Sequence, residues 1–181
     1  MEDFDLFVLG TGPASIRIAP KCAESGWRVG IVDPLPYGGT CALRGCNPKK
    51  VFVRAAELYD WICRAKGTGV RAEKAAIDWS ELVRFKNTFT APVTRSKEDR
   101  FESAGITQFR GNPRFIAPDR MVIDGQEIMS RKFVVATGAA PARLGICGEE
   151  FLPTSDDFFQ LETLPDRIVF VGGGSGRPWR P

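Results

Sequence analysis

Residues 5–33 contain the sequence DLFVLGTGPASIRIAPKCAESGWRVGIVD, in which two short apolar runs flank a glycine-rich turn and a helical segment. The first run, residues 5–9, predicts a buried strand. A helix is predicted from the turn to about Glu24, and a second strand from Arg28 to Val32. Strand, helix and strand in this order predict a βαβ unit, in which the two strands are parallel and adjacent.

The turn between the first strand and the helix contains a nucleotide-binding pattern, G-x-G-x-x-S, made by Gly10, Gly12 and Ser15. Gly10 allows a tight turn, and Gly12 lets the backbone approach a pyrophosphate. Pro13 suits the first turn of a helix because its missing N–H costs little there. Asp33, at the end of the second strand, is placed to accept hydrogen bonds from ribose hydroxyls. The pattern predicts a dinucleotide site; the alternative is a glycine-rich turn without a ligand.

A second motif, residues 38–50, has the sequence GGTCALRGCNPKK and leads into an amphipathic helix predicted over residues 51–64. Cys46 and Lys49 therefore lie at or near a helix N-terminus. There, exposed N–H groups and the helix dipole favour an anion and lower the pKa of a thiol. The neighbouring thiol of Cys41 can trap such a thiolate as a disulfide. These residues favour a redox-active pair over the alternative of two unpaired structural cysteines.

The chain has 181 residues, 43% of them hydrophobic, which is enough for a globular domain with a core. It begins with an acidic segment, residues 1–5, and has no long apolar run. We therefore expect neither a targeting peptide nor a membrane span, and predict a cytoplasmic protein. Structural disulfides are rare in the cytoplasm, so a catalytic role is the better interpretation of Cys41 and Cys46.

The composition argues against metal and nucleic acid as ligands. The chain has no histidine, and its remaining cysteines, Cys22, Cys63 and Cys147, lack the spacing of zinc ligands. The net charge is +3, without a basic stripe interleaved with aromatic residues. We expect a small-molecule dinucleotide as the ligand, and no metal, nucleic acid or membrane.

The rest of the chain continues an α/β pattern. Asp78 is predicted to cap a long helical stretch that is interrupted near Pro92 and ends at about Ala104. A short acidic helix is expected over residues 154–161. Further strands are predicted at residues 106–110, 114–116, 121–123, 127–129, 132–138 and 167–171.

These elements predict an α/β fold with two kinds of strand pairing. The parallel sheet is expected to contain the strands at Asp5, Arg28, Phe133 and Arg167. The closely spaced strands between residues 106 and 129 are expected to form a small antiparallel addition to it.

The last predicted strand opens a second glycine-rich turn, Gly172–Gly174, where a second dinucleotide site would begin. Residues 175–181, SGRPWRP, contain two prolines and no apolar period, so no helix is predicted there. We therefore expect residues 1–171 to form one nucleotide-binding domain, and residues 172–181 to be an aberrant tail where an NAD(P) domain would begin.

Taken in order, these motifs resemble those of the FAD-dependent pyridine nucleotide-disulfide oxidoreductases, such as glutathione reductase, mercuric reductase and dihydrolipoyl dehydrogenase. The resemblance covers residues 4–174 and implies a Rossmann-like FAD-binding domain. It implies FAD as the cofactor and, by family only, NAD(P)H as the reductant. The motifs that carry it are Gly10–Pro13, Asp33, Gly39–Lys49, Ala136–Gly138 and Gly172–Gly174.

The resemblance also implies roles for individual residues. Cys41 is similar to the interchange thiol that attacks a substrate disulfide, Cys46 to the thiol nearest the flavin, and Lys49 to a lysine near the flavin N5. Asp33 would hold the adenosine ribose. The other cofactor contacts expected from the fingerprint and the resemblance are Gly10, Gly12, Pro13, Ser15, Gly39, Thr40, Pro113, Ala136, Thr137 and Gly138. Pro113 replaces a residue whose backbone N–H contacts adenine, a group that proline lacks.

Two interpretations of the function remain open. The first is a truncated FAD-binding module with a redox-active Cys41–Cys46 pair and a weakened affinity for FAD. We expect no NAD(P)H-dependent turnover by that chain alone, because the family's NAD(P) and dimerisation domains, with their catalytic histidine, are absent. The second is a non-catalytic nucleotide-binding fold left by truncation or frameshift.

The sequence bears on association between copies of the chain and on the choice of substrate. Surfaces that would face the missing domains are expected to be apolar, which predicts a homo-oligomer. The residues do not select among glutathione, mercuric ion, dihydrolipoamide or another substrate.

Overall fold

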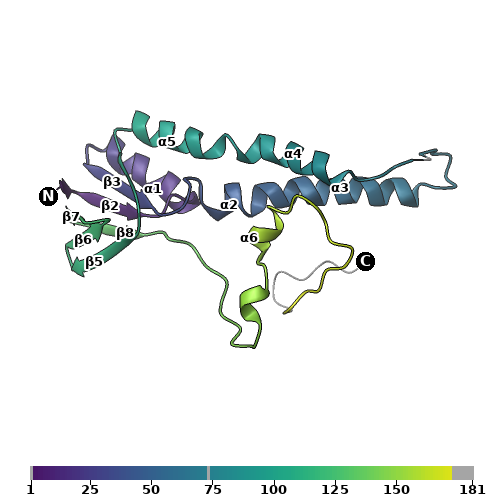
Figure 1. Ribbon diagram of the computed structural model, residues 1–181. Coiled ribbons are helices and arrows are strands. Elements are labelled where there is room, and N and C mark those ends of the chain that lie inside the picture. Colours follow the sequence, from purple (N-terminus) through teal and green to yellow (C-terminus); the bar gives the residue numbers. More distant parts are fainter. Residues whose placement is uncertain (1, 73, 173–181) are drawn as a thin grey trace.

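The computed structural model describes residues 2–72 and 74–172 of the chain, and Figure 1 shows the arrangement of its elements. Strands gather at one end of the molecule, and a pair of long helices extends away from them. The elements are β1 (Glu2–Phe4), β2 (Leu6–Leu9), α1 (Pro13–Glu24), β3 (Val29–Asp33), α2 (Gly39–Leu43), α3 (Cys46–Arg64), α4 (Trp79–Thr90), α5 (Val93–Ser103), β4 (Thr107–Arg110), β5 (Pro113–Ala117), β6 (Arg120–Ile123), β7 (Gln126–Ser130), β8 (Phe133–Val135), a 3-10 turn (Glu149–Phe151) and α6 (Ser155–Phe158).

The first sheet is parallel and has the strand order β4-β3-β2-β8. Leu6 pairs with Val29 across β2 and β3, and α1 crosses over between these two strands. The predicted βαβ unit is therefore confirmed. On the other side of β2, Phe7 pairs with Phe133 of β8. The carboxyl ends of these strands meet at one edge of the sheet, which is where open α/β sheets bind ligands.

The second sheet has the order β1-β7-β6-β5 and contains the predicted antiparallel addition. β5 with β6 and β6 with β7 are antiparallel, and β7 pairs in parallel with β1. Asp124 and Gly125, both with positive φ, form the two-residue turn between β6 and β7. Such a turn matches the twist of a hairpin and fixes its antiparallel pairing.

The prediction was wrong about β4, which belongs to the parallel sheet and not to the antiparallel addition. Residue Gly30 of β3 pairs with Thr107 of β4 in parallel. The reason is the connection: β4 follows the helix α5, and a helical crossover returns the chain in the same direction, whereas a two-residue turn reverses it.

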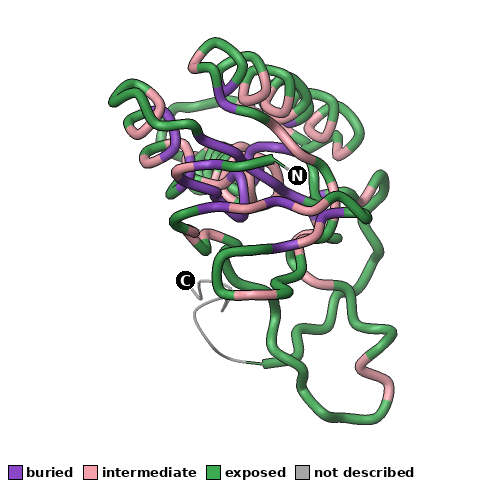
Figure 2. Tube along the Cα trace, turned by 90° about the vertical axis from the view of Figure 1, so that its left-hand side faces the viewer, coloured by how far each residue is buried: buried purple, intermediate pink, exposed green. Residues whose placement is uncertain are grey.

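The core has two parts because the strands of the parallel sheet are covered on both faces. Figure 2 shows that the buried residues concentrate in the strands. Along β2, Leu6 and Val8 face a cluster that includes residues of α1 and α5, while Phe7 and Leu9 face the second sheet. Strands buried on both faces are typical of parallel sheets with covering layers. Aromatic rings fill the space between the two sheets, with the centroids of Phe4 and Phe7 5.3 Å apart.

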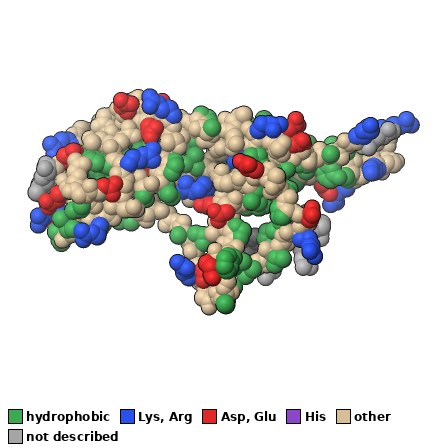
Figure 3. Space-filling model, viewed as in Figure 1, with side chains coloured by type: hydrophobic (Ala, Val, Ile, Leu, Met, Phe, Trp, Pro, Cys, Tyr) green, Lys and Arg blue, Asp and Glu red, His purple; other side chains and the backbone are tan. Residues whose placement is uncertain are grey.

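The helices α3 and α4 run side by side away from the sheets (Figure 1). α3 begins at Cys46, so the prediction of a helix N-terminus at Cys46 and Lys49 is confirmed. The predicted cap of α4 is confirmed as well, because the Asp78 side chain accepts from the Glu81 N–H at 2.9 Å. On the face shown in Figure 3, basic side chains gather at the tip of this helical pair, and both signs of charge are mixed elsewhere.

The predicted strand at residues 167–171 is wrong, because these residues form neither a helix nor a strand. Val169 is 86% exposed and Phe170 64% exposed. An apolar run becomes a strand only where it forms hydrogen bonds with a neighbouring strand. Among the described residues, 167–171 pair with no strand, and β8 remains the edge of its sheet. Of the predicted tail, residues 173–181 lie outside the described residues.

Candidate functional site

A cavity of about 890 Å³ lies at the carboxyl ends of β2, β3 and β8, within the size range of cofactor sites. It is bordered by the glycine-rich turn, the end of β3, the cysteine motif and the segment after β8. Its lining residues are Leu9, Gly10, Thr11, Gly12, Pro13, Ala14, Val32, Asp33, Pro34, Leu35, Gly39, Thr40, Cys41, Arg44, Gly45, Cys46, Pro113, Ala136, Thr137, Gly138 and Ala139.

Two glycines allow the backbone segments around the cavity to approach each other. Gly10 has φ +100, and a Cβ there would lie 2.4 Å from the Ala136 carbonyl oxygen. Gly39 has φ +68, and a Cβ there would lie 2.6 Å from the Cα of Gly12. The nucleotide-binding turn therefore touches both the segment after β8 and the cysteine motif, and only glycine fits at these two contacts.

The first turn of α1 suits an anion. Gly12 is its N-cap residue, and no side chain caps the helix. Its first N–H groups therefore remain available, and the positive end of the helix dipole lies at the cavity wall. A Cβ at Gly12 would meet only the Gly39 Cα, at 3.9 Å, so the space beside this backbone is open. This cradle fits the pyrophosphate of a dinucleotide.

Asp33 ties the glycine-rich turn to the end of β3. Its Oδ2 accepts hydrogen bonds from the Thr11 backbone N–H at 2.8 Å and from the Thr11 hydroxyl at 2.7 Å. Its Oδ1 accepts from the Leu35 N–H at 3.0 Å. A carboxylate offers about four acceptor positions, so Asp33 keeps capacity for one further donor such as a ribose hydroxyl.

Thr11 extends this connection to the cysteine motif. The Thr11 hydroxyl oxygen accepts a hydrogen bond from the Gly38 N–H at 3.2 Å, and the same hydroxyl donates a hydrogen bond to Asp33. Thr11 is buried, so these bonds are shielded from water. No role of Thr11 was predicted from the sequence, because the variable position of a G-x-G pattern carries no signal of its own.

Most of the predicted site residues meet at this cavity. The exceptions are Ser15 and Lys49, which do not line it. Ser15 is fully buried behind the turn, and its Oγ has no hydrogen-bond partner among the described residues. Lys49 is exposed on the first turn of α3. Pro113 lines the cavity but offers no N–H to a ligand.

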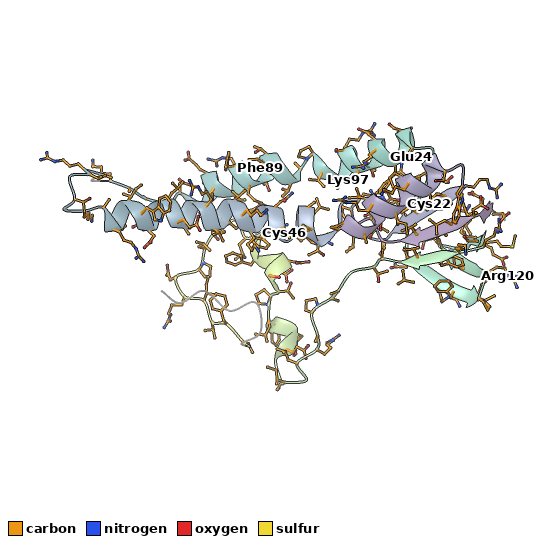
Figure 4. The ribbon with its side chains drawn as sticks, turned by 180° about the vertical axis from the view of Figure 1, so that it is seen from behind. Cys22, Glu24, Cys46, Phe89, Lys97 and Arg120 are labelled. Carbon is orange, nitrogen blue, oxygen red and sulfur yellow. The ribbon has the colours of Figure 1, made fainter. Side chains whose placement is uncertain are left out.

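The two cysteines of the motif lie on consecutive helices at the cavity wall. Cys41 is on α2 and Cys46 is the first residue of α3, where Figure 4 shows it beside α6. Both are free thiols in this structure. The hydrogen bond between the two side chains is the largest influence on both pKa values: it lowers the pKa of Cys46 and raises that of Cys41. The Lys49 charge lowers the pKa of Cys46 further.

A second contact to this motif was not predicted from the sequence. Arg44, between the two cysteines, forms an ion pair with Asp156 of α6, with its Nε 3.1 Å from the carboxylate Oδ2. The two residues are 112 positions apart, and nothing in the local sequence of either indicates the other.

The described residues contain no group of three or more histidine, cysteine, aspartate or glutamate side chains that could hold a metal ion. None of the described helices combines the length and apolar character of a membrane-spanning segment.

Comparison with known proteins matches residues 4–175 to the family described as pyridine nucleotide-disulphide oxidoreductase. The chain is 34% identical to a glutathione reductase of Burkholderia cepacia, over 95% of this chain and 38% of that protein. It is 33% identical to a mercuric reductase of Staphylococcus aureus, over 95% of this chain and 32% of that protein. It is 28% identical to a dihydrolipoyl dehydrogenase of Chlamydia pneumoniae, over 96% of this chain and 38% of that protein.

A parallel α/β sheet with a glycine cradle at its carboxyl ends, and two cysteines that line the same cavity, define a Rossmann-like nucleotide-binding domain. The chain belongs to the pyridine nucleotide-disulphide oxidoreductase family. It spans less than two-fifths of the length of the curated relatives described above.

Replacing Thr11 tests the connection between the turn, β3 and the cysteine motif. We expect Thr11→Val to lower the free energy of unfolding by about 1–3 kcal/mol, because the Gly38 N–H loses its acceptor and the Asp33 Oδ2 loses one of its two donors. Urea denaturation measures the change. The matched control is Thr88→Val, whose exposed hydroxyl donates only to the Phe85 carbonyl and should cost no more than about 0.5 kcal/mol. Equal losses for the two variants would contradict the assignment.

The acidity of Cys46 gives a second test. Because its pKa is lowered and that of Cys41 is raised, Cys46 forms the thiolate at lower pH and should react with iodoacetamide first as the pH rises. Lys49→Gln should move the Cys46 profile to higher pH by removing a stabilising charge. Lys66→Gln, beyond the far end of α3, should leave it unchanged. Mass spectrometry of the alkylated peptides gives both profiles, and faster labelling of Cys41 would refute the prediction.

Proposed function

We propose that this chain is an FAD-binding module in which the Cys41–Cys46 pair exchanges electrons with the bound flavin. The single observation that carries the proposal is that the glycine cradle and both cysteines border one cavity. When bound, the flavin would supply a two-electron carrier to the dithiol. Proximity within one cavity is what such a transfer requires.

The residues of the cradle would bind the cofactor through its adenosine half. The first turn of α1 at Gly12 would hold the pyrophosphate, and the free acceptor position of Asp33 would take a ribose hydroxyl. Cys46, with its lowered pKa, would be the thiolate at the flavin side, and Lys49 would keep it charged. Cys41 would then be the thiol that meets a substrate.

The identity of the electron donor and of the substrate is proposed by family membership alone. Relatives carry the names glutathione reductase, mercuric reductase and dihydrolipoyl dehydrogenase. We propose NAD(P)H as the donor and a disulfide or a thiol-binding metal ion as the substrate class of the whole protein. We propose the cytoplasm as the compartment of this chain, because structural disulfides are rare there and a cysteine pair is more often catalytic.

Association between copies of the chain stays a prediction. It is supported by large apolar side chains that are exposed in the structure, among them Trp61 at 61% and Phe151 at 81%. Exposed apolar surface of this kind favours contact with a partner.

FAD binding is the first test of the proposed function. Titrated FAD should raise the melting temperature, and a concentration about 100 times its dissociation constant adds about 2.7 kcal/mol of stability. Gly12→Ala places a methyl group in the open space of the cradle and should weaken binding at least about tenfold, which is 1.4 kcal/mol. Gly12 has φ −76, so the variant should melt like the wild type without FAD. Absence of any FAD-dependent shift in the wild type would contradict the proposal.

Disulfide formation is the second test. In a glutathione redox buffer, Cys41 and Cys46 should become linked, because their thiols hydrogen-bond each other, while Cys22, Cys63 and Cys147 should stay unlinked. Mass spectrometry of non-reduced peptides identifies the link. A folded, oxidised sample in which both thiols remain free would leave the second interpretation, a nucleotide-binding fold without redox chemistry.

A further inference from the structure

The short helix α6 lies against the cysteine motif although it is far from it in sequence. α6 starts at a capping box, in which Thr154 and Asp157 hydrogen-bond each other's side chain and backbone. This local structure sets Asp156 on the first turn of α6. Figure 1 shows α6 below the junction of α2 and α3, and the Arg44–Asp156 ion pair bridges the gap.

Three further contacts hold the segment around α6 in place. The Lys86 Nζ, which is almost fully buried, donates to the Phe159 carbonyl at 2.9 Å. The Trp79 Nε1 donates to the Leu161 carbonyl at 2.9 Å. The Phe52 ring of α3 stacks on the ring of Phe159 with centroids 5.7 Å apart. Because α6 is anchored to α3 and α4 at several points, Asp156 is a fixed partner for Arg44.

Arg44 is in the segment that joins the two thiols. It ends α2, where its N–H donates to the Thr40 carbonyl at 2.8 Å. The next residue, Gly45, is packed so closely that a Cβ would lie 3.1 Å from that same carbonyl oxygen. The side chains of Arg44 and Asp156 are 21% and 38% exposed, so water screens the pair less than a surface ion pair. Fixing Arg44 therefore restrains the whole Cys41–Cys46 segment.

We propose that Asp156 is a positioning residue, which through Arg44 holds the Cys41–Cys46 segment closed and so favours formation of the disulfide. The inference rests on the proposed redox role of the two cysteines. Restraining two groups near each other raises their effective concentration, and the gain appears in the equilibrium of the bond they form. Lys86 and Trp79 support the same arrangement by holding α6.

The reaction to be followed has a defined balance. The thiols of Cys41 and Cys46 give two electrons and two protons to one glutathione disulfide. An S–S bond forms between the two cysteines, the S–S bond of the glutathione disulfide breaks, and two glutathione thiols are released. At half conversion, the square of the reduced glutathione concentration divided by the oxidised glutathione concentration gives the equilibrium constant, because two thiols form for each glutathione disulfide consumed.

Asp156→Asn removes the ion pair with almost no change of volume. We expect the disulfide of this variant to be about tenfold less favoured, which is about 30 mV for a two-electron couple. The matched control is Asp99→Asn, which removes an exposed ion pair with Arg95 on α5 and should leave the equilibrium unchanged. Asp156→Glu, which keeps the charge, should restore most of the wild-type value.

Arg44→Gln separates positioning from a simple effect of charge. If the ion pair acts by positioning, Arg44→Gln and Asp156→Asn shift the equilibrium in the same direction, and the double variant shifts it no further than either alone. If charge alone acted on the thiolates, the two variants would shift it in opposite directions, and that result would overturn the proposal. Circular dichroism of each variant confirms that it is folded before its equilibrium is measured.

The outcome also distinguishes this inference from the proposed function. A wild-type chain that forms no Cys41–Cys46 disulfide contradicts the redox role itself. A wild-type chain that forms it, with the same equilibrium in Asp156→Asn, contradicts only the positioning role of Asp156.

Discussion

The hydrogen bonds between Asp33 and Thr11 are the constraint on which the site depends. They join the end of β3 to the turn after β2, so the two central strands of the parallel sheet end at a fixed separation. The same hydroxyl of Thr11 accepts from the Gly38 N–H and so fixes where the cysteine motif begins. A buried network of this kind is stable only when every member has its partner, which makes the three segments one structural unit.

The chemistry at the cavity follows from how closely these segments approach. Because Gly39 packs against Gly12, the helix that begins at Cys46 lies beside the nucleotide-binding turn. Two helix N-termini, those of α1 and α3, thus border the same cavity. One is suited to a phosphate and the other to a thiolate, since both ligands are anions that exposed N–H groups stabilise.

Local patterns predicted the elements whose hydrogen bonds are local or whose partner is close in the chain. The βαβ unit, the start of α3 at Cys46 and the cap at Asp78 are of this kind. Predictions failed where a distant partner decides. β4 joined the parallel sheet because α5 brings the chain back along β3, and residues 167–171 form no strand although they are as apolar as β8.

The sequence by itself determined the family, and it predicted most of the residues that line the cavity, because glycines at fixed spacing and a cysteine pair before a helix have few other uses. The sequence did not show that Ser15 is buried behind the cavity or that Lys49 lies outside it. The direction of a side chain depends on how its helix packs against the rest of the fold. Only the tertiary structure brought Asp156 to Arg44. Arg44 and Asp156 are 112 positions apart, so their ion pair forms only after the segment that contains α6 has packed against α3 and α4.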